Sequence, residues 1–422
     1  MPVLVRRGRS VDGSPAPNCT VSADGSYAAR LTRADRDGTA WYPERWTLDG
    51  PEPYAVPLPG RQPEAPGAGV LPMSDGRVLV HRPADGRHHF ALLYPTGPRT
   101  GEVPLGVVPG GALRLLPPAP GGCRAYALVD ERGATAVWLV AGGPFGPERV
   151  AEVPGRCGGG AWLDRAGRLL AVDRESEGRI KTVVVDLGQG GVVSPLLQLT
   201  EDSTDRLLLA DADSGLLLIR SDAPSPGRER LGWGVLGSTL PVRFPDCLRP
   251  AGCTVTPFAI QPGQVLTPES CAVALRITPS GGPREGDGSG GWLGLWRPAE
   301  RTLHQLPAPD GWLTGTGVWD EAGVLRLPYS TAAVPCGLAR VPLPGRSGTR
   351  AEGSAAGQAT HPGTATGVLD TPSKSGDSMT HEPGRSGQQP VEDGAGDGGD
   401  EVGGARPVPL QQAPLTGRED DG

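Results

Sequence analysis

The chain has 422 residues, including 66 glycines and 47 prolines, and carries a formal net charge of −7. Glycine and proline at this abundance exclude a largely helical protein and indicate many turns. The basic residues are almost all arginine, a bias typical of a high-GC genome. Because the net charge is negative, we expect no nucleic-acid partner.

We expect a cytoplasmic protein that has no contact with a membrane. The first ten residues, MPVLVRRGRS, contain no apolar stretch like that of a signal peptide. No apolar run approaches the roughly 18 residues that a membrane span needs. The seven cysteines are odd in number, widely spaced and without a C-x-x-C pair, which favours buried free thiols over disulfides or a metal site.

Short hairpins recur along the chain at intervals of roughly 45–55 residues, the spacing of propeller arrays. The clearest is residues 161–174 (AWLDRAGRLLAVDR), in which a tight turn joins two apolar strands. Such turns need positive φ angles, which Asp-Gly and glycine-rich sequences supply. In chain order the turns fall at residues 24–25, 75–76, 120–122, 164–167, 211–215, 269–270 and 320–323.

Each hairpin is followed by a third apolar strand and, in six of the seven units, by a fourth. The predicted third strands are residues 40–49, 90–95, 134–141, 180–187, 231–236, 292–296 and 337–343. The predicted fourth strands are residues 54–58, 102–108, 148–153, 193–199, 240–244 and 303–306. Six tryptophans fall in third strands, where packing between sheets accounts for them: Trp41, Trp46, Trp138, Trp233, Trp292 and Trp296.

The inner strands favour a propeller over a β-sandwich. Residues 183–185, 207–209 and 216–219 are continuous apolar runs, which are typical of strands buried on both faces. A sandwich explains neither seven similar units nor four strands in each. We therefore predict an all-β fold, a seven-bladed β-propeller of four-stranded blades, over residues 1–345.

The vacant place in the seventh unit suggests how the ring closes. Residues 2–7 (PVLVRR) precede the first hairpin and belong to no unit of their own. We predict that this N-terminal strand pairs antiparallel with residues 337–343 and closes the propeller by covering an open edge. The alternative is a frayed terminus.

The segments SADGSYAARL, MSDGRVLVHR, DRAGRLLAVD and DEAGVLRL resemble the S-P-D-G-centred repeats of the WD40-like, TolB-like propeller superfamily. No copy keeps the proline, and the third and sixth copies lose the aspartate. The resemblance covers residues 2 to about 345 and implies an architecture that unrelated functions share. Related propellers often precede an α/β-hydrolase domain in prolyl-oligopeptidase-like enzymes, and the chain after residue 345 is too short and too polar to be that domain.

Residues 346–422 contain no Phe, Trp or Tyr and hold twelve acidic residues against six basic ones. Such a segment cannot bury enough apolar surface to offset the entropy of ordering, so we predict a disordered acidic tail. Its one apolar island, residues 408–415 (VPLQQAPL), is interpreted as a less polar part of this tail and not as a docking peptide.

The sequence predicts no catalytic residue, cofactor or metal. The motifs G-x-S-x-G, H-E-x-x-H and G-x-x-x-x-G-K-[ST] are absent. His81, His88 and His89 are interpreted as a surface cluster, because adjacent strand residues point to opposite faces and cannot both bind one metal. Asp211 and Asp213 resemble the start of a calcium loop, but the bidentate glutamate expected further on is missing.

Loops that join second to third strands open at one mouth of a propeller, and function in rigid scaffolds usually lies on such loops. The simpler alternative is a mixed-sign solvated rim that keeps the protein soluble. The polar residues of this possible binding rim are Arg33, Asp35, His81, Arg82, Asp130, Glu131, Asp173, Arg174, Arg220 and Asp222.

These observations lead to the hypothesis of a monomeric, non-catalytic propeller scaffold that binds an unidentified protein partner or a ligand. The alternatives are a propeller hydrolase or lyase acting at the channel mouth, and an accessory subunit of a separately encoded enzyme. The fold does not choose among them.

Overall fold

A computed structural model of the protein describes residues 19–33, 40–280, 291–320 and 322–343. Within these residues the chain forms 26 β-strands and three short 3-10 helices, η1 (Leu187–Gln189), η2 (Asp246–Leu248) and η3 (Pro268–Ser270). The described part contains no α-helix, and so no helix that could span a membrane. The strands form seven antiparallel sheets in which each strand pairs with its neighbours in the sequence.

The first four sheets have four strands each. They are β1 (Thr20–Val21), β2 (Tyr27–Arg33), β3 (Trp41–Thr47) and β4 (Tyr54–Pro57); β5 (Gly69–Pro72), β6 (Val78–Ala84), β7 (Arg87–Pro95) and β8 (Thr100–Pro109); β9 (Leu113–Leu115), β10 (Ala125–Glu131), β11 (Ala134–Ala141) and β12 (Glu148–Pro154); and β13 (Arg156–Trp162), β14 (Leu169–Ser176), β15 (Arg179–Asp186) and β16 (Val192–Leu197).

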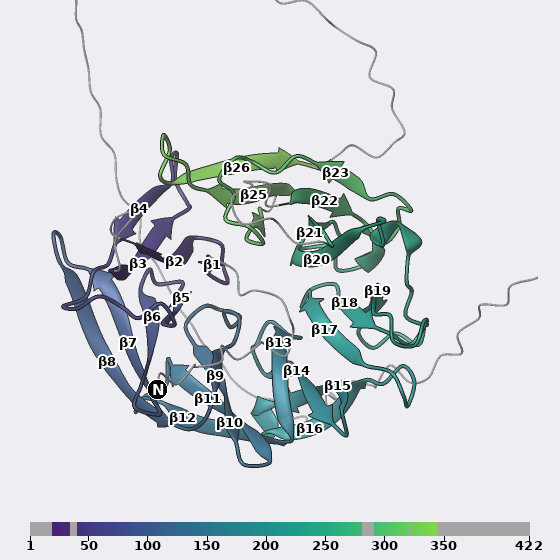
Figure 1. Ribbon diagram of the computed structural model, residues 1–422, viewed down its shortest axis with the longest axis horizontal. Helices are drawn as coiled ribbons and strands as arrows, with labels where there is room; N and C mark the ends of the chain where they lie inside the picture. Colours follow the sequence, from purple (N-terminus) through teal and green to yellow (C-terminus); the bar gives the residue numbers. More distant parts are fainter. Residues whose placement is uncertain (1–18, 34–39, 281–290, 321, 344–422) are drawn as a thin grey trace, which may run out of the picture. The chain divides into compact units, whose positions relative to one another are not determined.

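Of the remaining sheets, the sixth has four strands and the fifth and seventh have three. They are β17 (Asp205–Ala210), β18 (Leu216–Ser221) and β19 (Arg230–Val235); β20 (Cys253–Ile260), β21 (Val273–Pro279), β22 (Trp292–Trp296) and β23 (His304–Leu306); and β24 (Val318–Trp319), β25 (Val324–Tyr329) and β26 (Gly337–Pro342). Figure 1 shows the sheets following one another around a ring, with β5 near the centre and β8 outermost in the second sheet. The described residues therefore form a seven-bladed β-propeller, as the repeats predict.

Apolar clusters between neighbouring blades hold the ring together. The described residues contain seven such clusters, one for each pair of consecutive blades, including the pair formed by blades seven and one. Between blades three and four, for example, Leu128 and Val137 pack with Leu170 and Val172. Because each blade buries both faces, its inner strands are apolar without alternation.

The contact between the first and last blades closes the ring. Trp46 and Leu48 of blade one are buried, and Leu338 of blade seven packs against them. The Thr316 hydroxyl donates a 2.7 Å hydrogen bond to the carbonyl of Cys19. The Arg326 guanidinium donates to the carbonyl of Leu48. We call this contact the seam, since it joins residues that are nearly the whole propeller apart in sequence.

Aspartates at the turns between first and second strands cap these hairpins. A carboxylate oxygen of Asp164 accepts the backbone N–H groups of Arg168 and Leu169, each at 2.9 Å. In the second blade the turn also requires glycine, because Gly76 has φ +81° and a β-carbon there would lie 3.1 Å from the Tyr27 ring. The recurring Asp-Gly pairs are thus turn chemistry, as expected.

Two sequence expectations about strands and turns are wrong. Residues 240–244 form no fourth strand in blade five; Arg243 makes only an isolated bridge to Trp233. Pro241 and Pro245 flank that bridge and have no N–H to extend a ladder. The sixth turn is not a tight hairpin at residues 269–270, because a long connection containing η3 joins β20 to β21.

The predicted third strands are confirmed in all seven blades, and the last described strand of blade seven is β26. The predicted closing strand at residues 2–7 and the predicted tail at residues 346–422 lie outside the described residues. The seven cysteines are free, and Cys19, Cys157 and Cys271 are buried as expected. The expectation of buried thiols is wrong for Cys123, which is exposed, and only partly met by Cys247, Cys253 and Cys336, which are partly buried.

Candidate functional site

The antiparallel blades give the ring two faces with different connections. The turns between second and third strands, and the links that run from a fourth strand to the next blade, lie at one end, here called the upper face. Blade five has no fourth strand, so its link to β20 begins at the other end, where the Leu236 N–H donates to the carbonyl of Gly215. The connections between first and second strands, and between third and fourth strands, lie at the other end, here called the lower face. The rim predicted from the sequence belongs to the upper face.

The structure places nine of the ten predicted rim residues at the upper ends of second strands or next to them; Asp35 lies outside the described residues. They are Arg33 in β2, His81 and Arg82 in β6, Asp130 and Glu131 in β10, Asp173 and Arg174 in β14, Arg220 in β18, and Asp222 just after β18. They come from five blades, and Asp173 of blade four and Asp222 of blade five belong to one polar network.

Three acidic members of this rim, all at least partly exposed, contact neighbouring segments of the chain. Glu131 forms a 3.0 Å ion pair with Arg149. Asp130 lies 3.6 Å from the guanidinium of Arg156 in the next blade. Asp222 accepts the backbone N–H of Thr204 at 2.7 Å. These contacts account for the acidic residues without a ligand.

Arg82 is the centre of an ion-pair cluster on the outer side of blade two. Its Nε and Nη2 atoms donate to both carboxylate oxygens of Glu64 at 2.7–3.1 Å. Its Nη1 atom donates to Glu102 at 2.5 Å. The hydrogen bonds to Glu64 hold the pKa of Arg82 above its ordinary value. A guanidinium engaged in this way is not free to bind an anion.

His81 is buried against His88 between blades two and three, which corrects the expectation of a surface cluster. The two rings form a 2.9 Å hydrogen bond between His81 Nε2 and His88 Nδ1. The Nε2–H of His88 donates to the carbonyl of Gly111 at 2.7 Å, so Nδ1 of a neutral His88 must accept and His81 must donate. Burial, followed by the effect of His88, lowers the pKa of His81 to about 4. His89 is exposed, as the alternation of a strand predicts.

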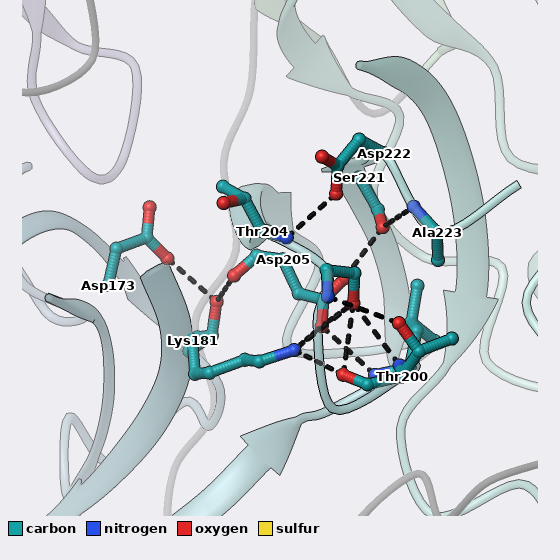
Figure 2. A network of polar contacts seen from close by, with 11 residues as sticks. Asp173, Lys181, Thr200, Thr204, Asp205, Ser221, Asp222 and Ala223 are labelled. Carbon is teal, nitrogen blue, oxygen red and sulfur yellow. Dashed lines mark hydrogen bonds and ion pairs between the residues drawn. The ribbon is translucent and has the colours of Figure 1, made fainter. Parts of the chain in front are cut away.

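The densest buried polar network on the upper face surrounds Asp205, between blades four and five (Figure 2). Figure 2 shows the Lys181 ammonium reaching Asp205 and the segment around Thr200; Nζ lies 2.7 Å from Asp205 Oδ2 and 2.5 Å from the Thr200 carbonyl. Ser221 donates to Asp205 Oδ1 at 2.6 Å, and the Leu199 N–H donates to Oδ2 at 3.0 Å. Asp205 is fully buried, and its charge is balanced within the network.

Asp173 belongs to the same interface between blades. It is buried, and its Oδ1 atom accepts the Thr182 hydroxyl at 2.7 Å and the Leu207 N–H at 3.1 Å. Because Leu207 lies in the innermost strand of blade five, this carboxylate fastens two blades together. Asp173 lies in a blade that contributes to the predicted rim, but its side chain is buried and does not face solvent.

The network around Asp205 contains a serine next to a lysine, but it is not arranged for nucleophilic catalysis. Lys181 Nζ donates to Ser203 Oγ at 3.1 Å in addition to Thr200 and Asp205. All three ammonium hydrogens are thus engaged, and the lysine has no lone pair to take the serine proton. The two aspartates that resemble the start of a calcium loop also have partners within the protein. Asp211 accepts hydrogen bonds from Ser214, and Asp213 accepts one from Arg165.

No group of three or more His, Cys, Asp or Glu side chains in the described ranges could hold a metal ion. Burial raises the pKa of the Cys157 and Cys271 thiols to about 11, so both are protonated at neutral pH and are poor nucleophiles.

The lower face gathers exposed apolar side chains. Phe145, in the connection between β11 and β12, is 97% exposed, and Leu266, between β20 and β21, is 92% exposed. Four more large apolar residues that are at least half exposed lie on the same face: Tyr54, Val192, Leu240 and Val265. Among the described residues only Val334 is a comparable exposed residue in an upper-face connection, and Val103 and Val107 lie along the outer strand β8. The apolar surface is therefore concentrated on the face opposite the predicted rim.

A pocket of about 350 Å³ opens on the lower face between blades three and four. Tyr126, Leu139, Val150 and Leu187 form its apolar walls. Its remaining lining includes the charged residues Arg124, Glu148 and Arg168 and the backbone of several glycines. The connection that contains Phe145 contributes Gly142, Gly143 and Pro144 to this lining.

The residues of the lower face were not among the predicted site residues, although one signal was visible in the sequence. Phe145 lies within GGPFGP, and Leu266 lies within QPGQVLTP. A large apolar residue inside a glycine- and proline-rich turn is not needed by the turn, and it has no strand neighbours to pack against. The pocket itself depends on how two blades pack and has no local signal.

The fold and these surfaces define a seven-bladed β-propeller whose most exposed large apolar residues lie on its lower face. No known protein family and no curated protein matches the chain in sequence. Solved structures that it resembles include TolB from Acinetobacter baumannii, with a TM-score of 0.39 and 12% identity, covering 75% of this chain and 79% of that one. Oligogalacturonate lyase from Vibrio parahaemolyticus gives a TM-score of 0.47 and 10% identity, with 77% and 89% covered.

Prolyl oligopeptidase B from Galerina marginata gives a TM-score of 0.45 and 13% identity. That alignment covers 74% of this chain and 46% of the oligopeptidase, so the chain spans less than half of that enzyme's length. The structure thus resembles TolB-like and prolyl-oligopeptidase β-propellers in fold alone.

Proposed function

We propose that the protein is a non-catalytic scaffold that docks a protein partner through its lower face. The observation that carries this proposal is the concentration of exposed apolar residues there, led by Phe145 and Leu266. Exposed large apolar side chains that share one face of a protein offer surface to a partner, and aromatic residues are enriched at the centres of protein contacts. The loops that carry these residues are held by rigid strands, which favours a preorganised surface.

The charged groups on the upper face form ion pairs with one another, and this supports the non-catalytic part of the proposal. Lys181, Asp205 and Arg82 each satisfy their charge within the protein. A propeller hydrolase or lyase acting at the upper mouth is the alternative, and an accessory subunit of a separate enzyme is a form of the docking proposal in which the partner is that enzyme.

The test compares three forms of the full chain as affinity baits: the wild type, a lower-face variant and a matched variant. The lower-face variant carries Phe145→Ser and Leu266→Ser. The matched variant carries Val103→Ser and Val107→Ser, which remove exposed apolar side chains from the outer strand β8 instead. A protein retained by the wild type and the matched variant is then identified, purified and titrated against all three forms by calorimetry.

We expect the purified partner to bind the wild type and the matched variant with equal affinity and the lower-face variant at least tenfold more weakly, about 1.4 kcal/mol. Equal binding of all three forms, or no retained partner at all, contradicts the docking proposal. Turnover of any substrate in a hydrolase and lyase screen of the purified chain contradicts the non-catalytic part.

A further inference from the structure

The pocket between blades three and four carries polar groups that have no partner in the protein. Arg124 and Glu148 both line it and are exposed, and neither forms an ion pair or a side-chain hydrogen bond within the described part of the chain. Arg168, the other cation of the lining, lies 3.5 Å from Asp186 and is neutralised by it. One positive and one negative group therefore remain available at the same opening.

Tyr126 adds an observation of a different kind. Its side chain lies in the wall of the pocket and packs against Trp162, with ring centroids 5.1 Å apart. The residue is only 5% exposed, and its hydroxyl, which makes no hydrogen bond to any described residue, is not among the fully buried side-chain atoms, so it is accessible from the pocket. A phenol hydroxyl at the wall of a pocket is both a donor and an acceptor, and it usually finds a polar partner. In this pocket the partner would have to come from a ligand or from solvent.

The walls decide the rest of the ligand's chemistry. Leu139 and Val150 of blade three and Leu187 of blade four present apolar surface beneath the charged opening. The cavity volume is at the lower end of the range for small-molecule sites, roughly 300–1,000 Å³. A fitting ligand is thus small, has an apolar body, and carries a carboxylate for Arg124 and an ammonium for Glu148.

We propose that this pocket binds a small zwitterion with an apolar side chain, that is, an apolar α-amino acid or dipeptide. In such a molecule both charges lie at the polar end and the side chain extends from it, which matches charged groups at the opening and apolar walls below. An internal segment of a protein lacks both terminal charges and fits less well. The inference goes beyond the proposed scaffold function and does not depend on a protein partner.

Calorimetric titration of the full chain tests the ligand class. The probes are L-leucine, L-phenylalanine and L-leucyl-L-leucine, and each comparison compound lacks one element of leucine. These compounds are 4-methylpentanoate without the ammonium, 3-methylbutylamine without the carboxylate, and N-acetyl-L-leucinamide without either charge. We expect at least one zwitterion to bind and each comparison compound to bind at least tenfold more weakly.

Variants then place the binding in this pocket. Arg124→Gln and Glu148→Gln should each weaken the zwitterion about tenfold or more, and Tyr126→Phe about two- to tenfold. Arg132→Gln and Glu201→Gln remove exposed charges elsewhere and should leave binding unchanged. The proposal is overturned if no zwitterion binds, if the capped or singly charged compounds bind as well, or if the pocket variants bind like the controls.

Discussion

Protonation of His81 should make the stability of the propeller depend on pH in a defined window. In the folded protein His81 is 6% exposed and its ring donates to His88. Burial lowers its pKa from 6.5 to about 4. As the pH falls below 6.5, His81 of the unfolded chain binds a proton, whereas His81 of the folded chain does not bind one until about pH 4. Stability is therefore fully present above pH 6.5 and is lost as the pH falls from 6.5 to 4.

The magnitude follows from the two pKa values. A fall in the pKa from 6.5 to about 4 corresponds to about 3.4 kcal/mol when the whole window is crossed. Between pH 7 and pH 4.5 the same relation gives a loss of about 2.5 kcal/mol in the free energy of unfolding from this one residue. Carboxylates also titrate in this range, so the quantity to compare is the difference between variants.

Urea unfolding at pH 7 and pH 4.5 measures this contribution. His81→Gln keeps a donor for His88 and removes the titrating ring, so it should lose about 2.5 kcal/mol less than the wild type between the two pH values. His89→Gln, which alters an exposed histidine of the neighbouring strand β7, should behave like the wild type. Equal pH dependence of the wild type and His81→Gln would refute the reasoning.

Three further predictions concern the upper face and the seam. Asp205→Asn should lower the free energy of unfolding, measured in urea, by roughly 3–5 kcal/mol, because it leaves the Lys181 charge without its partner. Asp202→Asn, at an exposed ion pair, should change it by no more than about 0.5 kcal/mol. Similar values for the two variants would contradict a buried ion pair. Thr316→Val removes a hydrogen bond of the seam, so it should lower the free energy of unfolding by about 1–3 kcal/mol and accelerate amide exchange in β1. Thr135→Val removes a hydrogen bond between blades three and four and should leave amide exchange in β1 unchanged. Deleting residues 1–8 should expose the edge of β26, lower stability by roughly several kcal/mol and promote aggregation; a monomeric protein with unchanged exchange in Gly337–Pro342 would count against a closing strand.

The architecture could be predicted because it is written in short local patterns. Asp-Gly turns and continuous apolar runs require only a few neighbouring residues, and the hairpins at residues 24–25 and 164–167 form as predicted. The error at residues 240–244 is local too. Their apolar content favours a strand, but Pro241 and Pro245 remove the donors that a strand needs.

The polar sites could be predicted only in part, because they form between blades. Asp205 and Lys181 come from different blades, and nothing near either residue in the sequence announces the other. From the sequence His81 looks like an exposed rim residue, but its ring is buried against His88 and Phe90. The pocket likewise requires Arg124 and Glu148 of blade three to face Leu187 of blade four. Such positions depend on packing between blades, which periodicity does not encode.

The seam gives the seven blades the topology of a cycle instead of a row. In a linear array of repeats, the two end units have one neighbour each and open most readily. Here every blade shares an apolar cluster with two neighbours, and blade one finds its second neighbour in blade seven. Opening any one blade therefore requires the apolar clusters on both of its sides to separate together. Rupture of the seam alone would convert the cycle into a row and leave two blades, far apart in sequence, as its fraying ends.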